Sequence, residues 1–239
     1  IDFGRARYFD PITNVITNFP TSGKPGDIES MAVDPTTGIV YLTSADRLPG
    51  GPSGTQALWA ADLDTVNVTN GVVFKLVGHI DAQGDNASEN LAYYNGRLYF
   101  AQTNGTALNT DTNTDGLSYI TISGLNPNPM LATNAIPVGL LTGAGADIYY
   151  LDGLEILPDG TTYGVDGYDD QLYTINLSTG AILTVSDNNL NGGLSGSVDI
   201  ETVVWDPVNS KLIGADNGVQ RFVDVTPGTN GGNLVTSVY

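Results

Sequence analysis

One sequence pattern occurs four times along this chain, and it restricts the possible folds more than any other feature. In each copy an acidic residue precedes a short apolar segment, a turn rich in Pro, Gly or Asn follows, and a second short segment returns. The four lead acids are Glu29, Glu89, Asp152 and Glu201. Their spacing of roughly 50 to 60 residues is the period of a repeated all-β array, in which each copy forms one structural unit.

A second kind of hairpin lies between the acid-led copies. Its copies start near residues 57, 116, 171 and 219, and each alternates apolar with polar residues, as a strand with one solvent-exposed face does. The two hairpins together make a four-stranded antiparallel blade. The predicted blades cover residues 27–79, 86–138, 148–188 and 199–239. We therefore expect an all-β chain, folded as a single β-propeller domain over residues 1–239 with about four to five blades.

Residues 5–19 form an additional hairpin in this scheme. They match the second hairpin of a blade, but no acid-led hairpin precedes them. They could close the ring against the last blade, belong to a blade whose beginning is missing, or pair with a neighbouring molecule. A role within the chain is favoured, because an open sheet edge promotes aggregation and folds usually cover it.

The composition excludes several classes of function. The 239 residues carry a net charge of −18 and only eight Lys and Arg, so nucleic acid is not an expected partner. The absence of cysteine excludes disulfides, thiolate zinc sites and a cysteine nucleophile. No apolar run approaches the roughly 18 residues needed to cross a bilayer, so no membrane insertion is expected.

The composition also suggests where the protein acts. Charged residues make up only 14% of the chain, while Gly, Asn, Thr and Ser are abundant, which is typical of secreted β proteins. The chain starts at Ile1 rather than at Met, and we interpret this as a processed or truncated product, in which case the expected signal peptide has been removed. We therefore expect an extracellular or cell-surface protein.

The lead acids are the first candidates for a functional site. The first strand of a propeller blade lines the central channel, so its acidic start should lie near one mouth of that channel. Several carboxylates in one place repel one another unless a cation lies between them, and Ca²⁺ prefers oxygen ligands. The sequence therefore predicts a calcium site at the four lead acids, Glu29, Glu89, Asp152 and Glu201. The alternative is that each acid caps backbone N–H groups of its own blade, and Glu155 is a second candidate for the third position.

A second candidate calcium site lies in residues 111–116. Asp111, Asn113 and Asp115 alternate with threonines before Gly116, which fits the first half of a calcium loop, D-x-[DN]-x-[DN]-G. An EF-hand would need Glu at its twelfth position, where this chain has Ile122. The segment is therefore not an EF-hand, and its alternative interpretation is a solvated polar loop.

The chain offers little material for proton transfer. His79 is the only histidine, and its place at the end of an apolar strand favours a structural role. We predict no catalytic residue, and Ca²⁺ is the only expected cofactor. Three tyrosines are candidates for stacking on a ligand: Tyr93, Tyr94 and Tyr168. Asp166 and Asp216 follow second strands, where they serve either as turn residues or as part of a cation or ligand rim.

The first acid-led hairpin resembles a strand pair of known proteins. Residues 27–41, DIESMAVDPTTGIVY, resemble the pattern D-x-E-G-L-A-x-D-P-x-T-G-x-L-Y of secreted bacterial propellers, which include phytase-like esterase and gluconolactonase-like groups. Residues 153–160 and 199–207 look similar. In those enzymes, acids at these positions bind Ca²⁺ that polarises the substrate, which implies that the lead acids are ligands. Residues 111–116 likewise resemble the calcium loops of integrin-like propellers.

These observations predict an extracellular, calcium-binding propeller module without enzymatic activity, which serves adhesion, recognition or assembly at a bacterial surface. Its expected partners are further copies of itself, other surface proteins or glycans. Two alternatives stay open. One is a Ca²⁺-dependent hydrolase, such as a lactonase, an esterase or a phytase-like enzyme, with its metal at the channel mouth as a Lewis acid. The other is a calcium-dependent lectin.

Overall fold

The structure of the chain, a computed structural model, consists almost entirely of β-strands. It describes residues 6–10, 15–19, 21–22, 28–44, 55–66, 71–81, 90–102, 114–148, 150–166, 171–185, 200–217, 221–227 and 233–234. The helical segments within these ranges are two single 3₁₀ turns, η1 (Leu63–Thr65) and η2 (Ile122–Gly124). Neither these turns nor any other part of the described ranges forms a helix that is long and apolar enough to cross a membrane.

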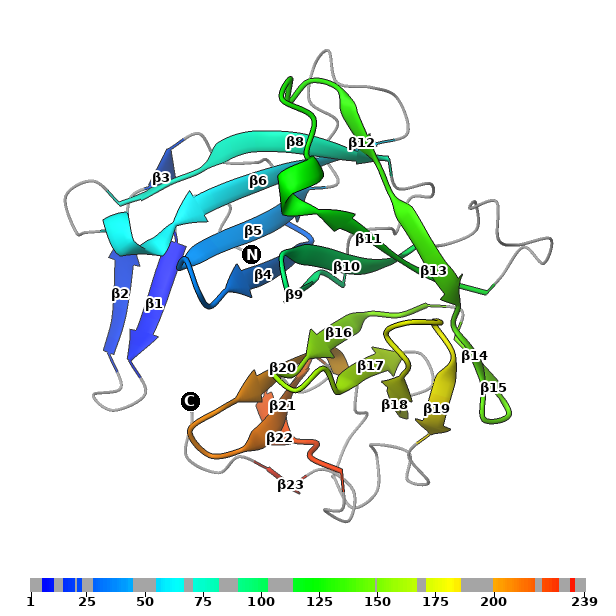
Figure 1. Cartoon of the computed structure of the whole chain (residues 1–239). Helices are drawn as coiled ribbons and strands as arrows, with labels where there is room; N and C mark the ends of the chain where they lie inside the picture. The colour runs from blue at the N-terminus through cyan, green and yellow to red at the C-terminus, as the bar shows by residue number, and fades with distance from the viewer. Residues whose placement is uncertain are drawn as a thin grey trace.

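Four antiparallel sheets form the blades of a propeller (Figure 1), so the predicted fold class is confirmed. The first sheet contains β4 (Ser30–Asp34), β5 (Ile39–Ser44), β6 (Gln56–Asp62) and β8 (Lys75–Asp81). The second sheet contains β9 (Ala92–Tyr94), β10 (Arg97–Gln102), β11 (Gly116–Thr121) and β13 (Ile136–Leu140), and the third contains β16 (Gly153–Ile156), β17 (Thr162–Asp166), β18 (Gln171–Ile175) and β19 (Ile182–Val185). The fourth sheet contains β20 (Ile200–Asp206), β21 (Lys211–Asp216), β22 (Arg221–Asp224) and β23 (Asn233–Leu234). The first strand of each blade contacts the first strand of the next, in the order β4, β9, β16 and β20.

Shorter strands connect or extend the blades. A fifth strand, β12 (Ala132–Asn134), joins the first sheet by pairing in parallel with β8, although the chain has by then left that blade. β3 (Thr21–Ser22) pairs in parallel with β7 (Val72–Val73), and β14 (Thr142–Gly143) forms a small hairpin with β15 (Ala146–Asp147). The parallel strand β12 does not follow from the repeat, because its residues belong to the connection between two strands of the second blade.

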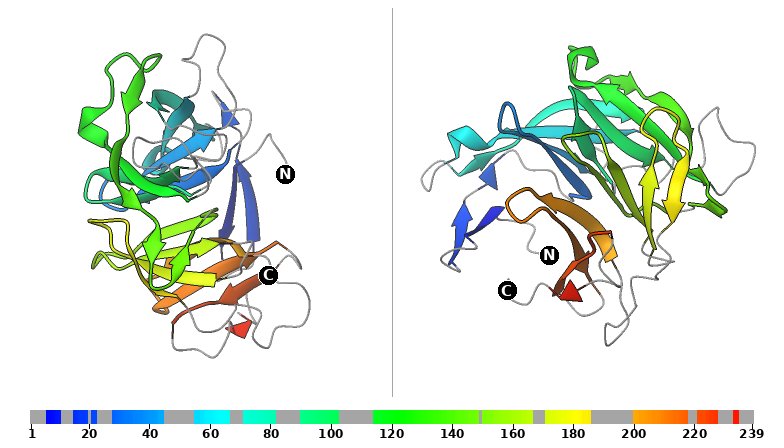
Figure 2. Two further views of the ribbon diagram at one scale, coloured as in Figure 1. Left: turned by 90° about the vertical axis from the view of Figure 1, so that its right-hand side faces the viewer. Right: turned by 60° about the horizontal axis from the view of Figure 1, so that its bottom comes forward.

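The additional hairpin at residues 5–19 forms the antiparallel pair β1 (Ala6–Asp10) and β2 (Val15–Phe19). Figures 1 and 2 place it on the open side of the propeller, between the first and the fourth sheets. Among the described strands, β1 and β2 pair only with each other. The hairpin therefore stands where a further blade would lie in a closed ring.

Turn chemistry explains where the inner strands end. In the second blade, Asn95 and Gly96 both have positive φ, 48° and 74°, in a two-residue connection between Tyr94 and Arg97, which matches the right-handed twist of a hairpin. The first blade uses an Asp-Pro turn instead. The carboxylate of Asp34 accepts hydrogen bonds from the N–H of Thr36 at 2.9 Å and the hydroxyl of Thr37 at 2.8 Å.

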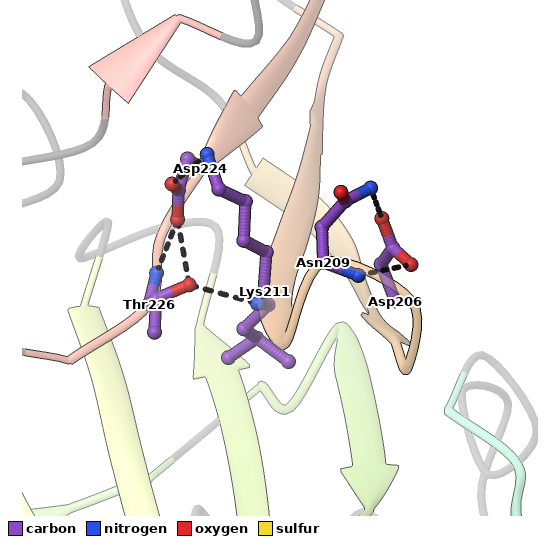
Figure 3. A network of polar contacts seen from close by, with 6 residues as sticks. Asp206, Asn209, Lys211, Asp224 and Thr226 are labelled. Atoms are coloured by element: carbon purple, nitrogen blue, oxygen red, sulfur yellow. Dashed lines mark hydrogen bonds and ion pairs between the residues drawn. The ribbon is translucent and has the colours of Figure 1, made fainter.

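The fourth blade repeats the Asp-Pro turn with different partners. The carboxylate of Asp206 accepts bonds from the side-chain amide of Asn209 at 2.6 Å and from its N–H at 3.2 Å (Figure 3). A second carboxylate nearby, that of Asp224, pairs with Lys211 at 3.0 Å and accepts the hydroxyl of Thr226 at 2.6 Å. These contacts fix the hairpin tip and the end of β22 without using the core.

Three of the four buried clusters of the described residues lie at the interfaces between successive blades, and the fourth lies within the first blade around Val40, Leu42 and Trp59. We call each interface a seam, the face of a blade turned to the preceding blade its front, and the opposite face its rear. One buried cluster fills the first seam and includes Leu58, Ile80, Leu98 and Phe100. Two further clusters fill the second and third seams, the second around Tyr99, Leu154 and Tyr173 and the third around Val165, Val203 and Leu212. Burial of these side chains is the main source of stability, because apolar burial dominates folding.

The third seam is close enough to exclude even one methyl group at Gly153. A Cβ atom there would lie 2.8 Å from the Cα of Thr202 and 2.7 Å from the Cγ1 of Val165. We expect Gly153→Ala to lower the free energy of unfolding by about 1–3 kcal/mol, because overpacking forces the backbones of β16 and β20 apart. Urea unfolding followed by fluorescence measures this change.

Gly78→Ala is the matched control for this substitution. A Cβ at Gly78 would meet only the flexible end of Leu125, at 3.3 Å. Its effect on unfolding should be much smaller than that of Gly153→Ala. Equal effects of the two substitutions would contradict the close approach of β16 to β20.

Candidate functional site

The structure places two of the lead acids at the same position of their blades. The backbone N–H of Glu29 donates to the carbonyl of Thr43 at 3.1 Å, and that of Asp152 donates to the carbonyl of Val165 at 2.9 Å. Both acceptors are the last residue but one of the second strand of the blade. Asp152, rather than Glu155, therefore holds the third lead position.

Glu201 differs from these two acids because its strand is irregular. The register of β20 against β21 shifts between Ile200 and Thr202, so Glu201 lies in a bulge. Its side chain is exposed, and its Oε1 accepts a hydrogen bond from the side-chain amide of Asn217 at 2.9 Å. The remaining lead acid, Glu89, lies outside the described residues.

Of the three candidate ligands in the predicted calcium loop, Asp115 lies within the described residues, and it is buried. Its Oδ2 accepts the N–H of Leu151 at 2.9 Å, while its own N–H and carbonyl bond to Ile148 and Leu141. Asn90 holds the same residue, because its side-chain amide donates to the carbonyl of Leu151 at 2.6 Å. Asp115 and Asn90 thus fasten the chain that passes from the second blade to the third.

The calcium sites stay a prediction. Asp111 and Asn113 lie outside the described residues, as Glu89 does. The described ranges contain no group of three or more His, Asp or Glu side chains placed to hold a metal ion. Calcium typically takes six to eight oxygen ligands, and the Oδ2 of Asp115 accepts a hydrogen bond from the backbone of the connection between two blades.

The acids expected at the rim are buried at the ends of second strands. Asp166 and Asp216 are the last residues of β17 and β21, and each is only 2% exposed. The carboxylate of Asp216 is paired with the Nε of Arg221 at 2.7 Å. Ser44 and Gln102 end β5 and β10 and are also buried. All four blades therefore carry a buried polar side chain at this position.

His79 is buried in the first sheet, in agreement with a structural role. Its Nδ1 lies 2.6 Å from the carbonyl oxygen of Pro129. The strand β12 begins three residues after Pro129 and pairs with β8, where Ala132 lies opposite His79. The imidazole thus helps to hold the connection that crosses the first blade.

Glu155 is a carboxyl group whose environment the sequence analysis did not identify. It lies on the rear of β16, three residues after the lead acid Asp152. Ala32 and Ala92 occupy the corresponding positions of the first two blades and are 6% and 3% exposed. Burial raises the pKa of Glu155 to about 7, and the N–H donated by Trp205 opposes that rise. The signal in the sequence was a charged residue between Leu154 and Ile156, at a position where other copies have alanine.

The candidate tyrosines have different surroundings. Tyr93 stacks on Tyr41, with ring centroids 6.4 Å apart and an interplanar angle of 6°, and its hydroxyl bonds to Asp34. Burial, together with this bond, raises the pKa of Tyr93. Tyr94 is half-buried on the opposite face of the second sheet, beside Arg97. Tyr168 lies outside the described residues.

Known structures share this fold at low sequence identity. No family model matches the sequence, and neither does any curated protein. The chain is similar to glutaminyl cyclase from Myxococcus xanthus, with a TM-score of 0.50, 13% identity, and 88% of this chain and 75% of that chain covered. It is also similar to a chain of a nidogen/laminin complex, with a TM-score of 0.54, 15% identity, and 96% of this chain and 73% of that chain covered.

At these identities the likeness shows the fold alone. The propeller that the resemblance of residues 27–41 implied is confirmed. Folds of this kind serve both enzymes and binding modules, so the fold by itself assigns no function. Membership of the phytase-like or gluconolactonase-like groups stays a prediction, and so does secretion.

The half-buried carboxyl of Glu155 makes a specific prediction about pH. The pKa of Glu155 is about 7 in the folded chain and near 4.5 in the unfolded chain. Between pH 4.5 and pH 7, the folded chain therefore keeps a proton on Glu155 that the unfolded chain has lost. The contribution of Glu155 to the free energy of unfolding is highest below its unfolded-state pKa. It falls by on the order of 2–3 kcal/mol as the pH rises through the folded-state pKa. We expect Glu155→Gln to unfold with the same free energy at pH 5.5 and pH 8, unlike the wild type.

Glu201→Gln is the control, because the side chain of Glu201 is exposed. It should keep the wild-type pH dependence. Chemical denaturation at the two pH values measures the difference between the variants. An identical pH dependence in the wild type and in Glu155→Gln would show that Glu155 is already ionised at pH 5.5.

Proposed function

We propose that this chain is an extracellular, calcium-stabilised propeller module without enzymatic activity, which serves recognition or assembly at a surface. The observation that carries the proposal is an exposed apolar position at each end of the blade array. In the four blades in order, the second residue after the lead acid is Met31, Leu91, Leu154 and Val203. Leu91, Leu154 and Val203 are 3–4% exposed, whereas Met31 is 60% exposed.

The opposite end of the array shows the same contrast. Val204 follows its lead acid by three residues, as Ala32 and Ala92 do, and it is 53% exposed. Phe222 lies on the same rear face, at a 38% exposed position of β22. We define the end faces as Met31 and Val33 on β4, and Val204 and Phe222 on the fourth sheet. Exposed apolar groups of this kind mark interaction surfaces.

The single imidazole of the chain supports a function without catalysis. His79 is buried and bonded to the carbonyl of Pro129, so this group is not presented to a substrate in solvent. The acidic composition and the D-x-N-x-D-G segment support the calcium part of the proposal. The nidogen/laminin complex supports the proposal by showing a similar fold within an assembly of proteins.

The end faces predict self-association at high concentration. We expect the mass measured by light scattering after size exclusion to rise with protein concentration. Met31→Glu and Val204→Glu should each reduce this rise, because a charge on an end face opposes its burial. Leu183→Glu is the matched control, since Leu183 is 56% exposed but lies on the outer strand β19. A constant monomer mass, or an equal effect of all three substitutions, would contradict assembly through the end faces.

The calcium part of the proposal predicts a stability that depends on the ion. A site that is filled at a hundred times its dissociation constant stabilises the folded chain by about 2.7 kcal/mol. We therefore expect a chelator to lower the melting temperature by several degrees relative to excess calcium. Asp111→Ala with Asn113→Ala should melt at the lower temperature in both conditions. Thr112→Ala is the control within the same segment, and an unchanged melting temperature of the wild type in chelator would exclude a stabilising calcium ion.

A further inference from the structure

Arg97 is held in a defined position by two tyrosines of its own blade. The centre of its guanidinium group, Cζ, lies 4.4 Å from the centroid of the Tyr119 ring. Its Nη1 donates to the hydroxyl of Tyr99 at 3.2 Å. The rings of Tyr99 and Tyr119 are themselves in contact, with centroids 5.4 Å apart and an angle of 40°. Stacking and a hydrogen bond therefore orient the guanidinium group before any ligand arrives.

The position of Arg97 is unusual in so acidic a chain. The sequence has 26 Asp and Glu but only eight Lys and Arg. Within the described ranges, Lys211 and Arg221 pair with Asp224 and Asp216, while no ion pair is found for Arg97. Its side chain is exposed at the start of β10. The charge is thus presented to solvent on an aromatic support, with no ion pair to a carboxylate of the described residues.

The remaining donors of Arg97 suit a carboxylate. A guanidinium group has five N–H donors in one plane, of which Tyr99 receives one. The others can bind both oxygens of a carboxylate in the parallel arrangement that arginine favours. Because the group is already oriented, little side-chain freedom is lost on binding.

Tyr94 adds a flat surface beside the guanidinium group. It lies directly opposite Arg97 in the β9–β10 pairing, on the face turned to the third blade. The end of its ring reaches the turn of that blade, where a Cβ at Gly160 would lie 3.0 Å from the tyrosine hydroxyl oxygen and 3.4 Å from its Cζ. A ligand with one carboxylate and a ring with an apolar face would match both groups.

We propose that Arg97 and Tyr94 form a binding site for a carboxylate-bearing sugar residue of a glycan. The carboxylate binds to the guanidinium group, and the apolar face of the sugar ring lies on Tyr94. The net charge of −18 favours a ligand with a single negative charge over an acidic peptide, because each further charge is repelled by the protein. This site lies at the second seam, and the proposal goes beyond self-association through the end faces.

The test is an NMR titration of the whole 239-residue chain with methyl β-glucuronide and with the neutral methyl β-glucoside. We expect saturable binding of the glucuronide and at least about tenfold weaker binding of the glucoside, because the latter lacks the partner of the guanidinium group. Arg97→Gln should abolish the preference, and Arg97→Lys should weaken glucuronide binding about tenfold, because lysine lacks the planar pair of donors. Tyr94→Ala should weaken the binding of both sugars.

Lys75→Gln is the matched control, since it removes one exposed positive charge from the first blade. It should bind the glucuronide as the wild type does, and melting curves should show that every variant is folded. Three results would overturn the proposal: no saturable binding of the glucuronide, unchanged binding by Arg97→Gln, or tighter binding of an aspartate-rich peptide than of the glucuronide. Light scattering on the same samples reports self-association separately, so the failure of one proposal is distinguishable from the failure of the other.

Discussion

The packing of one blade's inner strand on the next is the interaction on which the rest of the structure depends. β4, β9, β16 and β20 follow one another at the centre, and a buried cluster fills each of the three seams between them. The close approach at Gly153 shows how little space the third seam leaves. The side chain two residues after a lead acid packs on the preceding blade, and the next side chain packs on the following blade. A blade with two neighbours therefore buries both positions, whereas Met31 on β4 and Val204 on β20 stay exposed.

The sequence predicted the blades because apolar and polar residues alternate along each strand and the same group of four strands recurs along the chain. The same repeat could not predict which copies lie at the ends of the array, because Met31 and Leu154 occupy the same place in the pattern and differ only in what packs on them. Nor could it predict β12, which joins the first sheet from a connection of the second blade. The burial of Glu155 was equally hidden, since it depends on β20, which lies some fifty residues further along the chain.

Acidic residues in this fold tie segments of backbone together. Asp115 holds the peptide of Leu151, Asp34 and Asp206 hold Asp-Pro turns, and Asp224 holds Thr226. Hydrogen bonds lower the pKa of Asp206, chiefly the bond from Asn209, and those from Thr37 and Thr36 lower the pKa of Asp34 despite the opposing effect of burial. An acidic repeat is therefore explained in part by the backbone groups that short strands and tight turns leave unpaired. For Asp115 the calcium site stays a prediction, and the pattern alone could not indicate that its Oδ2 accepts the N–H of Leu151.

The same reasoning separates Arg97 from the other charged groups. Carboxylates that serve the fold lie at strand ends and turns, where backbone donors are available, and the bases Lys211 and Arg221 neutralise two of them. Arg97 lies at a turn as well, yet the contacts found for it among the described residues are those with the two tyrosines. Holding a cation over an aromatic ring contributes only about 0.5–1 kcal/mol at an exposed site, which is little support for the fold. A pre-oriented guanidinium group in a strongly acidic protein is therefore better explained by a ligand than by stability.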